Sequence, residues 1–96
     1  MEALVMLEKA IEARFVKECK KRGWLCLKQN VIGRRGYPDR LVVLKDGTHI
    51  WVELKTAKGV LSEGQKTAIE ALEANEASVF IVYGLEEALQ VIKDLE

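Results

Sequence analysis

The sequence predicts one α/β domain whose elements follow the order helix, strand, strand, strand, helix, strand, helix. Three observations lead to this prediction. Apolar residues recur at helical spacing near the N-terminus, an Asp-Gly turn separates two strand-like runs, and a nearly all-apolar run precedes an amphipathic C-terminal segment. With 96 residues, 49% hydrophobic content and one proline, residues 1–96 fit a single globular domain.

Residues 3–22 are predicted to form the first helix. At about 100° per residue, its apolar side chains share one sector, with Val5 and Val16 at the edge; they are Leu4, Leu7, Ile11, Phe15 and Cys19. Glu8 and Glu12 fall in the same sector, where a carboxylate is costly unless it is paired or bound to a cation. Gly23 is expected to end the helix.

Three strands and a glycine-containing loop follow the first helix. The strands are predicted at 24–29, 39–44 and 48–55, with a loop at 30–38 and a hairpin turn at Asp46-Gly47. In the third strand, Glu53 and Lys55 point to the same face because side chains alternate along a strand. Trp24 and Trp51 lie within these strands, which favours a core position over a base-stacking role.

The C-terminal part is predicted to contain helix, strand and helix. Ser62 and Gln65 have capping-box spacing, and they open a helix that runs to about Asn75. Residues 78–83 are nearly all apolar, as in a strand covered on both faces. Gly84 is expected to break the chain before a last helix at 85–95.

The charges are balanced in total but separated along the chain. Lys and Arg number 15, as do Asp and Glu, so the formal charge is zero. Residues 14–35 hold eight basic side chains and one acid, Glu18, whereas residues 62–96 hold eight acids and two lysines. This asymmetry either offers a positive surface to a polyanion such as nucleic acid or reflects a solvated helix face followed by a turn.

Several classes of protein are excluded or disfavoured. Charges interrupt the chain before about 18 apolar residues accumulate, so no membrane-spanning helix is expected. The start, Met1-Glu2-Ala3-Leu4, lacks the basic region of a secretory signal. Cys19 and Cys26 fit neither C-x-x-C nor zinc-ligand spacing, which indicates buried thiols in a reducing compartment. No P-loop or Ser/His/Asp arrangement is found, and we expect a cytoplasmic protein without a nucleotide cofactor.

Candidate chemistry lies at one end of the predicted hairpin. With a turn at Asp46-Gly47, position 39 lies opposite about position 54, so Asp39 approaches Glu53 and Lys55. Neighbouring carboxylates repel unless a cation intervenes, and oxygen ligands suit Mg²⁺ or Mn²⁺. Taken alone, a Glu-x-Lys on a strand is usually a solvated face.

The combination of motifs resembles an established nuclease superfamily. Pro38-Asp39 followed after thirteen residues by Glu53-Leu54-Lys55 is similar to the PD-(D/E)XK signature. Together with Gly36-Tyr37-Pro38-Asp39 and Gly59-Val60-Leu61-Ser62-Glu63-Gly64-Gln65, it resembles the virus-type replication-repair nuclease (VRR-NUC) domain, with its G-x-P-D, E-x-K and G-x-L-S-x-x-Q motifs. The resemblance implies a restriction-endonuclease-like αβββαβ core, a mixed central sheet flanked by helices, and an additional C-terminal helix.

The resemblance also implies roles for individual residues. Asp39, Glu53 and the backbone carbonyl of Leu54 would hold Mg²⁺ or Mn²⁺, and Lys55 would be the catalytic lysine. A glutamate of the first helix would assist: Glu12, eleven residues before Gly23, has the spacing of related archaeal-type junction resolvases and is preferred to Glu8. Gln65 matches the family glutamine, although a capping role explains it equally well.

Further residues are candidates for contacts with DNA. Arg34 and Arg35, flanked by glycines, are suited to clamp a phosphate backbone, and Lys58 lies just after the third strand. The alternative for each of these three residues is a solvent-exposed side chain with no role in binding. His49 is remote in sequence from the acids, so a histidine-based mechanism is disfavoured.

The resulting expectation is a metal-dependent, structure-selective DNA endonuclease that cuts four-way (Holliday) junctions as a homodimer in a bacterial or phage-infected cytosol. Two alternatives remain: a nuclease directed to flaps or nicks, and a catalytically silent DNA-binding module on the same fold. Intact Asp39, Glu53 and Lys55 argue against the silent module.

Overall fold

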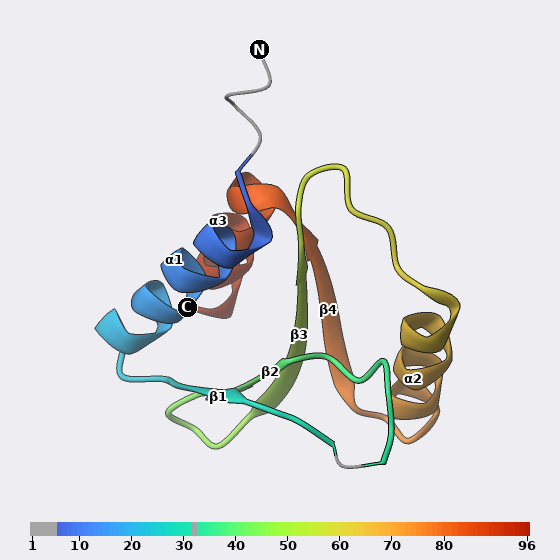
Figure 1. Cartoon of the computed structure of the whole chain (residues 1–96). Coiled ribbons are helices and arrows are strands. Elements are labelled where there is room, and N and C mark those ends of the chain that lie inside the picture. The colour runs from blue at the N-terminus through green and yellow to red at the C-terminus, as the bar shows by residue number, and fades with distance from the viewer. Residues whose placement is uncertain (1–5, 32) are drawn as a thin grey trace.

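The structure, a computed structural model, describes residues 6–31 and 33–96 (Figure 1). Its elements are α1 (Glu8–Lys21), β1 (Leu25–Lys28), β2 (Arg40–Val43), β3 (His49–Lys55), α2 (Glu63–Ala74), β4 (Ser78–Tyr83) and α3 (Gly84–Leu95). This order confirms the predicted α/β class with its additional C-terminal helix. None of the helices described has the length and hydrophobicity needed to cross a membrane.

The four strands form one mixed sheet in the order β1-β2-β3-β4. β1 pairs antiparallel with β2 and β2 antiparallel with β3, whereas β3 and β4 are parallel. Parallel neighbours need a crossover connection, and here α2 provides it. Figure 1 shows α1 and α3 on one side of β3 and β4, and α2 on the other side.

The hydrophobic core lies between the sheet and the pair α1 and α3. Side chains from both helices and from three strands are almost completely buried there: Ile11, Phe15, Cys19, Val42, Val52, Val82, Ala88 and Ile92. Because side chains alternate along β3, the residues between these core positions point to the face on which α2 lies. Glu53 and Lys55 are among them, so the core face positions the site without containing it.

The ends of several elements differ from the sequence-based predictions. α1 begins at Glu8, and Leu7 is an exposed, extended N-cap residue instead of a member of the apolar face. Positions 1–5, including Leu4, Val5 and the N-terminal residues compared with a secretory signal, lie outside the described residues. Trp24 precedes β1 instead of opening it.

Gly84 was predicted to break the chain before the last helix, but it is the first residue of α3 and follows β4 directly. Its φ of +84° is readily adopted by glycine and lets the chain turn without a linker. The carboxylate of Glu87 accepts a hydrogen bond from the Tyr83 backbone N–H at 2.9 Å. The helix therefore begins one residue earlier than predicted.

Candidate active site

Asp39 and Glu53 are brought together by the register of the β2–β3 hairpin. The ladder pairs Arg40 with Val52, one residue different from the predicted register. Continued by one residue, it places Asp39 opposite Glu53, on the face away from the core. Asp39 is exposed and follows the buried Pro38, whereas Glu53 is only 5% exposed.

Glu53 is a buried carboxyl group among charges of both signs. Burial raises its pKa to about 7, and the negative charges of Asp39 and Glu8 also raise the pKa, while Lys55 opposes the shift. The Lys55 Nζ lies 3.7 Å from Glu53 Oε2. Asp39, Lys55 and Glu8 therefore lie close enough to Glu53 to influence it electrostatically.

Gln65 makes both of the contacts that its two alternative roles require. Its backbone N–H donates to Ser62 Oγ at 3.1 Å, and its side-chain oxygen accepts from the Ser62 N–H at 2.8 Å, which completes a capping box. Its side-chain nitrogen donates to Glu53 Oε2 at 3.2 Å. One side chain thus fixes the start of α2 and holds the buried carboxylate.

The two carboxylates of α1 have different surroundings. Glu12 accepts hydrogen bonds from Arg40 Nε at 2.8 Å and from Lys28 Nζ at 3.2 Å. Partial burial opposes them, but these two cations lower the pKa of Glu12. Glu8 is exposed, and within the described part of the chain it forms no ion pair. The pairing of Arg40 with Glu12 was not predicted from the sequence. The signal that could have indicated it is a cation at a position of β2 that faces the core, where it needs a partner.

A small hollow connects α1 with the end of the hairpin. It is lined by Glu8, Glu12, Asp39, Arg40, Val52 and Leu54 and has a volume of about 10 Å³. That is about the volume of one water-sized sphere. Two glutamates of α1 and Asp39, which directly precedes β2, therefore border one small space beside Leu54.

The donor chemistry of this region fits a hard divalent cation, which prefers oxygen ligands. Asp39 and Glu53 supply carboxylates of like charge, and the backbone carbonyl of Leu54 belongs to the same strand end. Across residues 6–31 and 33–96, however, no three acidic, His or Cys side chains converge closely enough to hold a metal ion. Asp39 and Glu53 are therefore neighbours, but in the described residues no third such side chain joins them to complete a metal site.

The basic loop before Asp39 packs against the start of α2. Gly36 has a φ of +88°, and a Cβ there would overlap the Gly64 carbonyl, so only glycine fits without displacement. Arg34 Nη1 lies 3.4 Å from Tyr37 Oη, and the Tyr37 ring lies 6.4 Å from that of Trp51, measured between centroids. The loop is therefore held next to the helix that carries Gln65.

The other predicted site residues are exposed or remote. Lys58 is exposed, in the turn that the Gly59 N–H closes on Thr56 O at 3.0 Å. His49 is exposed at the opposite end of β3 from Lys55. Cys19 is buried and Cys26 half-buried, and both are free thiols. Trp24 packs partly against the core, as predicted. Trp51 does not, because it lies between the core residues Ile50 and Val52 of β3 and points to the opposite face, near Tyr37.

Part of the positive charge of residues 14–35 is neutralised within the protein. Glu18 pairs with Arg14 at 3.0 Å, with Lys21 at 3.5 Å and with Arg22 at 2.9 Å. Hydrogen bonds from Arg22 and Arg14 lower the pKa of Glu18 to about 2. Its position as the one acid among eight basic side chains was the sequence feature that could have indicated this cluster.

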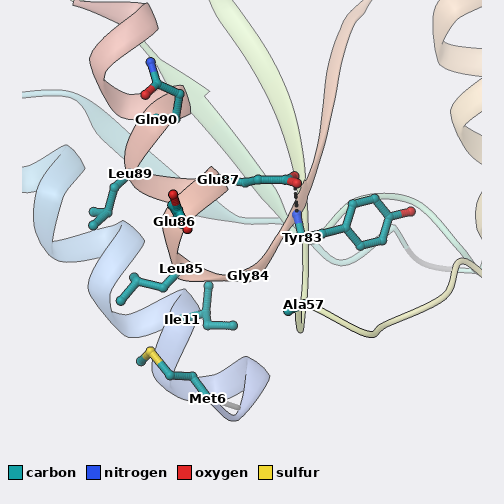
Figure 2. Close-up of a pocket in the computed structure, with 10 residues that line it drawn as sticks. All are labelled: Met6, Ile11, Ala57, Tyr83, Gly84, Leu85, Glu86, Glu87, Leu89 and Gln90. Carbon is teal, nitrogen blue, oxygen red and sulfur yellow. Dashed lines mark hydrogen bonds between the residues drawn. The ribbon is translucent and has the colours of Figure 1, made fainter. Parts of the chain in front are cut away.

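A larger hollow, about 860 Å³, lies elsewhere, beside the start of α3 (Figure 2). It is lined by Met6 and Ile11 of the α1 region, Ala57, and residues of α3 such as Leu85 and Leu89. Figure 2 shows the Tyr83 ring pointing away from this hollow. Glu86 and Glu87 line it, and its described lining contains no Lys or Arg, so it is a poor surface for a polyanion.

Two carboxylates and a lysine lie at the end of the central hairpin of this fold. A solved structure described as a VRR_NUC domain superposes on this chain with a TM-score of 0.84 and 24% sequence identity. The aligned region covers 93% of this chain and 97% of that structure. The fold is therefore that of a VRR-NUC domain, as the motifs predicted.

A curated phage protein is also similar in sequence. The "Putative nuclease p44" of Acyrthosiphon pisum secondary endosymbiont phage 1 is 48% identical over 48 residues, which are 50% of this chain and 52% of that protein. The chain thus matches about half the length of this relative. No family model matches the chain.

Proposed function

We propose that this chain is a divalent-metal-dependent DNA endonuclease of the VRR-NUC type. The observation that supports the proposal most directly is the end of the β2–β3 ladder, where Asp39 lies beside the buried Glu53. Lys55 and Gln65 both lie within 4 Å of the Glu53 carboxylate. Together with a divalent cation, a buried acid, a second acid, a lysine and a positioning amide can support hydrolysis of a phosphodiester.

In this proposal Asp39, Glu53 and the carbonyl of Leu54 hold Mg²⁺ or Mn²⁺. The bound cation would neutralise the scissile phosphate and lower the pKa of a coordinated water. Lys55 orients the attacking water and stabilises developing negative charge. Gln65 fixes the Glu53 carboxylate through its hydrogen bond, and it thereby acts as a positioning residue.

One carboxylate of α1 completes the donor set. The spacing before Gly23 favours Glu12, but Glu12 is already paired with Arg40 and Lys28. Glu8 borders the same hollow and raises the pKa of Glu53, so its charge is felt at the site. We therefore propose Glu8 for this role and assign Glu12 to anchoring α1 on β2.

The proposed substrate is branched DNA, with four-way junctions cut by a homodimer in a bacterial or phage-infected cytosol. Symmetric cutting of a junction needs two active sites at a fixed separation, which one 96-residue protomer does not provide. Arg34, Arg35 and Lys58 are exposed cations around the site and are proposed to contact the DNA backbone.

The test is a substrate panel with Mg²⁺ or Mn²⁺: four-way junction, flap, duplex and single strand. Symmetric nicks in the junction support the resolvase function, and cuts in the flap alone favour the flap nuclease. Asp39→Asn is expected to abolish cleavage and to leave DNA binding intact. Turnover retained by Asp39→Asn at ordinary Mg²⁺ contradicts the assignment, and a monomer by light scattering at micromolar concentration contradicts the dimeric resolvase.

A further inference from the structure

A groove lies between the basic loop and α2, on the side of the sheet away from the core. Arg34, Arg35 and Tyr37 form one wall, and Gly64, Thr67 and Ala71 contribute to the other. Its volume of about 460 Å³ falls within the usual range of about 300–1,000 Å³ for small-molecule sites. The groove is therefore large enough to accept part of a substrate.

The groove opens next to the proposed active site. Gly64, on its helical wall, precedes Gln65, whose side chain donates to Glu53. On the loop wall, Tyr37 is two residues before Asp39. The neighbouring Gly36 does not line the groove but packs against the backbone of Gly64 and Gln65, so the loop and the helix touch at this end. The groove therefore lies within a few residues of the proposed site on both walls, close enough to take a nucleotide next to the one at the carboxylates.

The walls combine the groups that bind an unpaired nucleotide. Arg34 and Arg35 are exposed, and in the part of the chain that the structure describes neither forms an ion pair, unlike Arg14, Arg22 and Arg40. Guanidinium groups pair with phosphates, and an aromatic ring such as that of Tyr37 stacks on a base. The small side chains of α2 leave a low wall on which a flat base can lie.

An unpaired nucleotide fits this combination better than a base pair. In a duplex the faces of the bases are covered by their neighbours, whereas an unpaired base exposes its face for stacking. A ring and two arginines at a groove provide stacking and phosphate pairing without reading a sequence.

We propose that the groove between residues 33–37 and α2 binds an unpaired nucleotide of the DNA strand beside the cleavage site. This inference rests on the proposed nuclease function and specifies its substrate: DNA in which single-stranded nucleotides adjoin the cut, as at a flap or an opened branch point.

The groove is tested first by binding, without metal and independently of cleavage. Fluorescence anisotropy of a labelled short single-stranded DNA is measured with the full chain. Ala71→Trp fills the groove from an exposed position, and Ala74→Trp is the matched control on the same helix outside the groove. Ala71→Trp is expected to weaken binding about fivefold or more, the effect of losing one stacked base, and Ala74→Trp is expected to leave it unchanged.

The arginines are tested by the salt dependence of the same binding. Each phosphate contact with a single strand contributes a slope of about 0.7 to log Kd against log salt concentration. The double variant Arg34→Ala/Arg35→Ala is expected to lower the slope by about 1.4. Lys17→Ala/Lys20→Ala removes two exposed charges from α1 and is expected to leave the slope unchanged.

The outcomes separate this inference from the nuclease proposal. Equal binding by Ala71→Trp and Ala74→Trp, or equal salt slopes for the two double variants, overturns the groove assignment even if the wild-type chain cleaves DNA. Absence of metal-dependent cleavage on every substrate overturns the nuclease function, while the binding results still decide whether the groove accepts single-stranded DNA. Circular dichroism and the thermal midpoint Tm verify that each variant is folded.

Discussion

Two buried glutamates in this chain have opposite electrostatic surroundings. Glu18, at the end of α1, is surrounded by Arg14, Lys21 and Arg22, and its pKa is lowered to about 2. Glu53, in the central strand, lies near Asp39 and Glu8, and burial together with these acids raises its pKa to about 7 despite Lys55. Their side chains are similarly inaccessible, at 9% and 6% exposed. Burial is the largest cause of the raised pKa of Glu53, whereas hydrogen bonds from Arg22 and Arg14 outweigh burial at Glu18.

The comparison distinguishes a carboxylate that the fold itself stabilises from one that we propose to bind a ligand. A carboxylate surrounded by cations stabilises the native state, and the arrangement around Glu18 has no need of a ligand. A carboxylate buried beside other carboxylates is unfavourable in the free protein, and such arrangements concentrate at functional sites. The contrast therefore supports the site at the end of the β2–β3 hairpin independently of the motifs.

The largest expected effect comes from removing the charge of Glu53. Glu53→Gln is expected to lower the proposed cleavage rate by about 10³-fold or more, because the variant loses a proposed metal ligand. Its thermal midpoint should not fall, since a buried negative charge beside Asp39 is removed. Glu18→Gln is the matched control and should cleave like the wild-type chain at temperatures where both are folded. Equal loss of activity in the two variants would show that the two regions do not differ as described.

Gln65→Glu tests the contact between α2 and Glu53. Glutamate at this position still accepts a hydrogen bond from the Ser62 N–H, so the capping box and the stability of α2 are kept. The new carboxylate repels Glu53 and cannot donate to it, and a loss of about 10–100-fold in cleavage rate is expected. Steady-state cleavage and thermal melts are the measurements. Unchanged cleavage with an unchanged midpoint would leave Gln65 with its capping role alone.

Gly36→Ala tests the packing of the basic loop on α2, with Gly33→Ala as its control. Both glycines have positive φ, so each substitution introduces backbone strain of about 1–2 kcal/mol. Only at Gly36 does the added Cβ also overlap the Gly64 backbone, whereas nothing lies within 4 Å at Gly33. Chemical denaturation should therefore give a larger loss for Gly36→Ala. Similar losses would argue against the close approach of the loop and helix.

The smallest effect is expected from the pH dependence that Glu18 confers. Its native pKa of about 2 lies below its ordinary value of 4.5, so its contribution to stability is complete above about pH 4.5 and lost as pH falls toward 2. The difference in Tm between the wild-type chain and Glu18→Gln should follow this course. The effect is modest because its partners are solvent-accessible. A difference in Tm that grows as the pH falls would contradict the ion-pair assignment. Glu70→Gln, at an exposed position, is the control and should not show this pH dependence.

The order of elements was predictable because each has a local pattern. The Asp46-Gly47 turn fixes the hairpin, the Ser62 and Gln65 spacing fixes the start of α2, and the apolar run 78–83 coincides with β4. Alternation along β3 likewise predicted that Glu53 and Lys55 share a face. These features depend on neighbours in sequence, which a single chain displays.

Features that depend on long-range contacts were not predictable in the same way. The pairing of Glu12 with Arg40, separated by 28 positions, depends on how α1 lies on the sheet. Gly84 has the residue type of a break, yet its positive φ joins β4 to α3 without a linker. The predicted register of the hairpin was off by one residue: it opposed Asp39 to about position 54, whereas the observed ladder places Asp39 opposite Glu53. The turn alone does not fix how the ladder continues.

The parallel pairing of β3 with β4 implies an order of assembly for the site. The hairpin of β2 and β3 joins segments close in sequence and can form within microseconds, whereas β4 must wait until residues 56–77 have closed a long loop. Asp39 and Glu53 therefore meet while water still surrounds both. We therefore expect Glu53 to lose that water only when α2 and β4 pack against the hairpin, so that the repulsion between the two acids becomes strong late in folding.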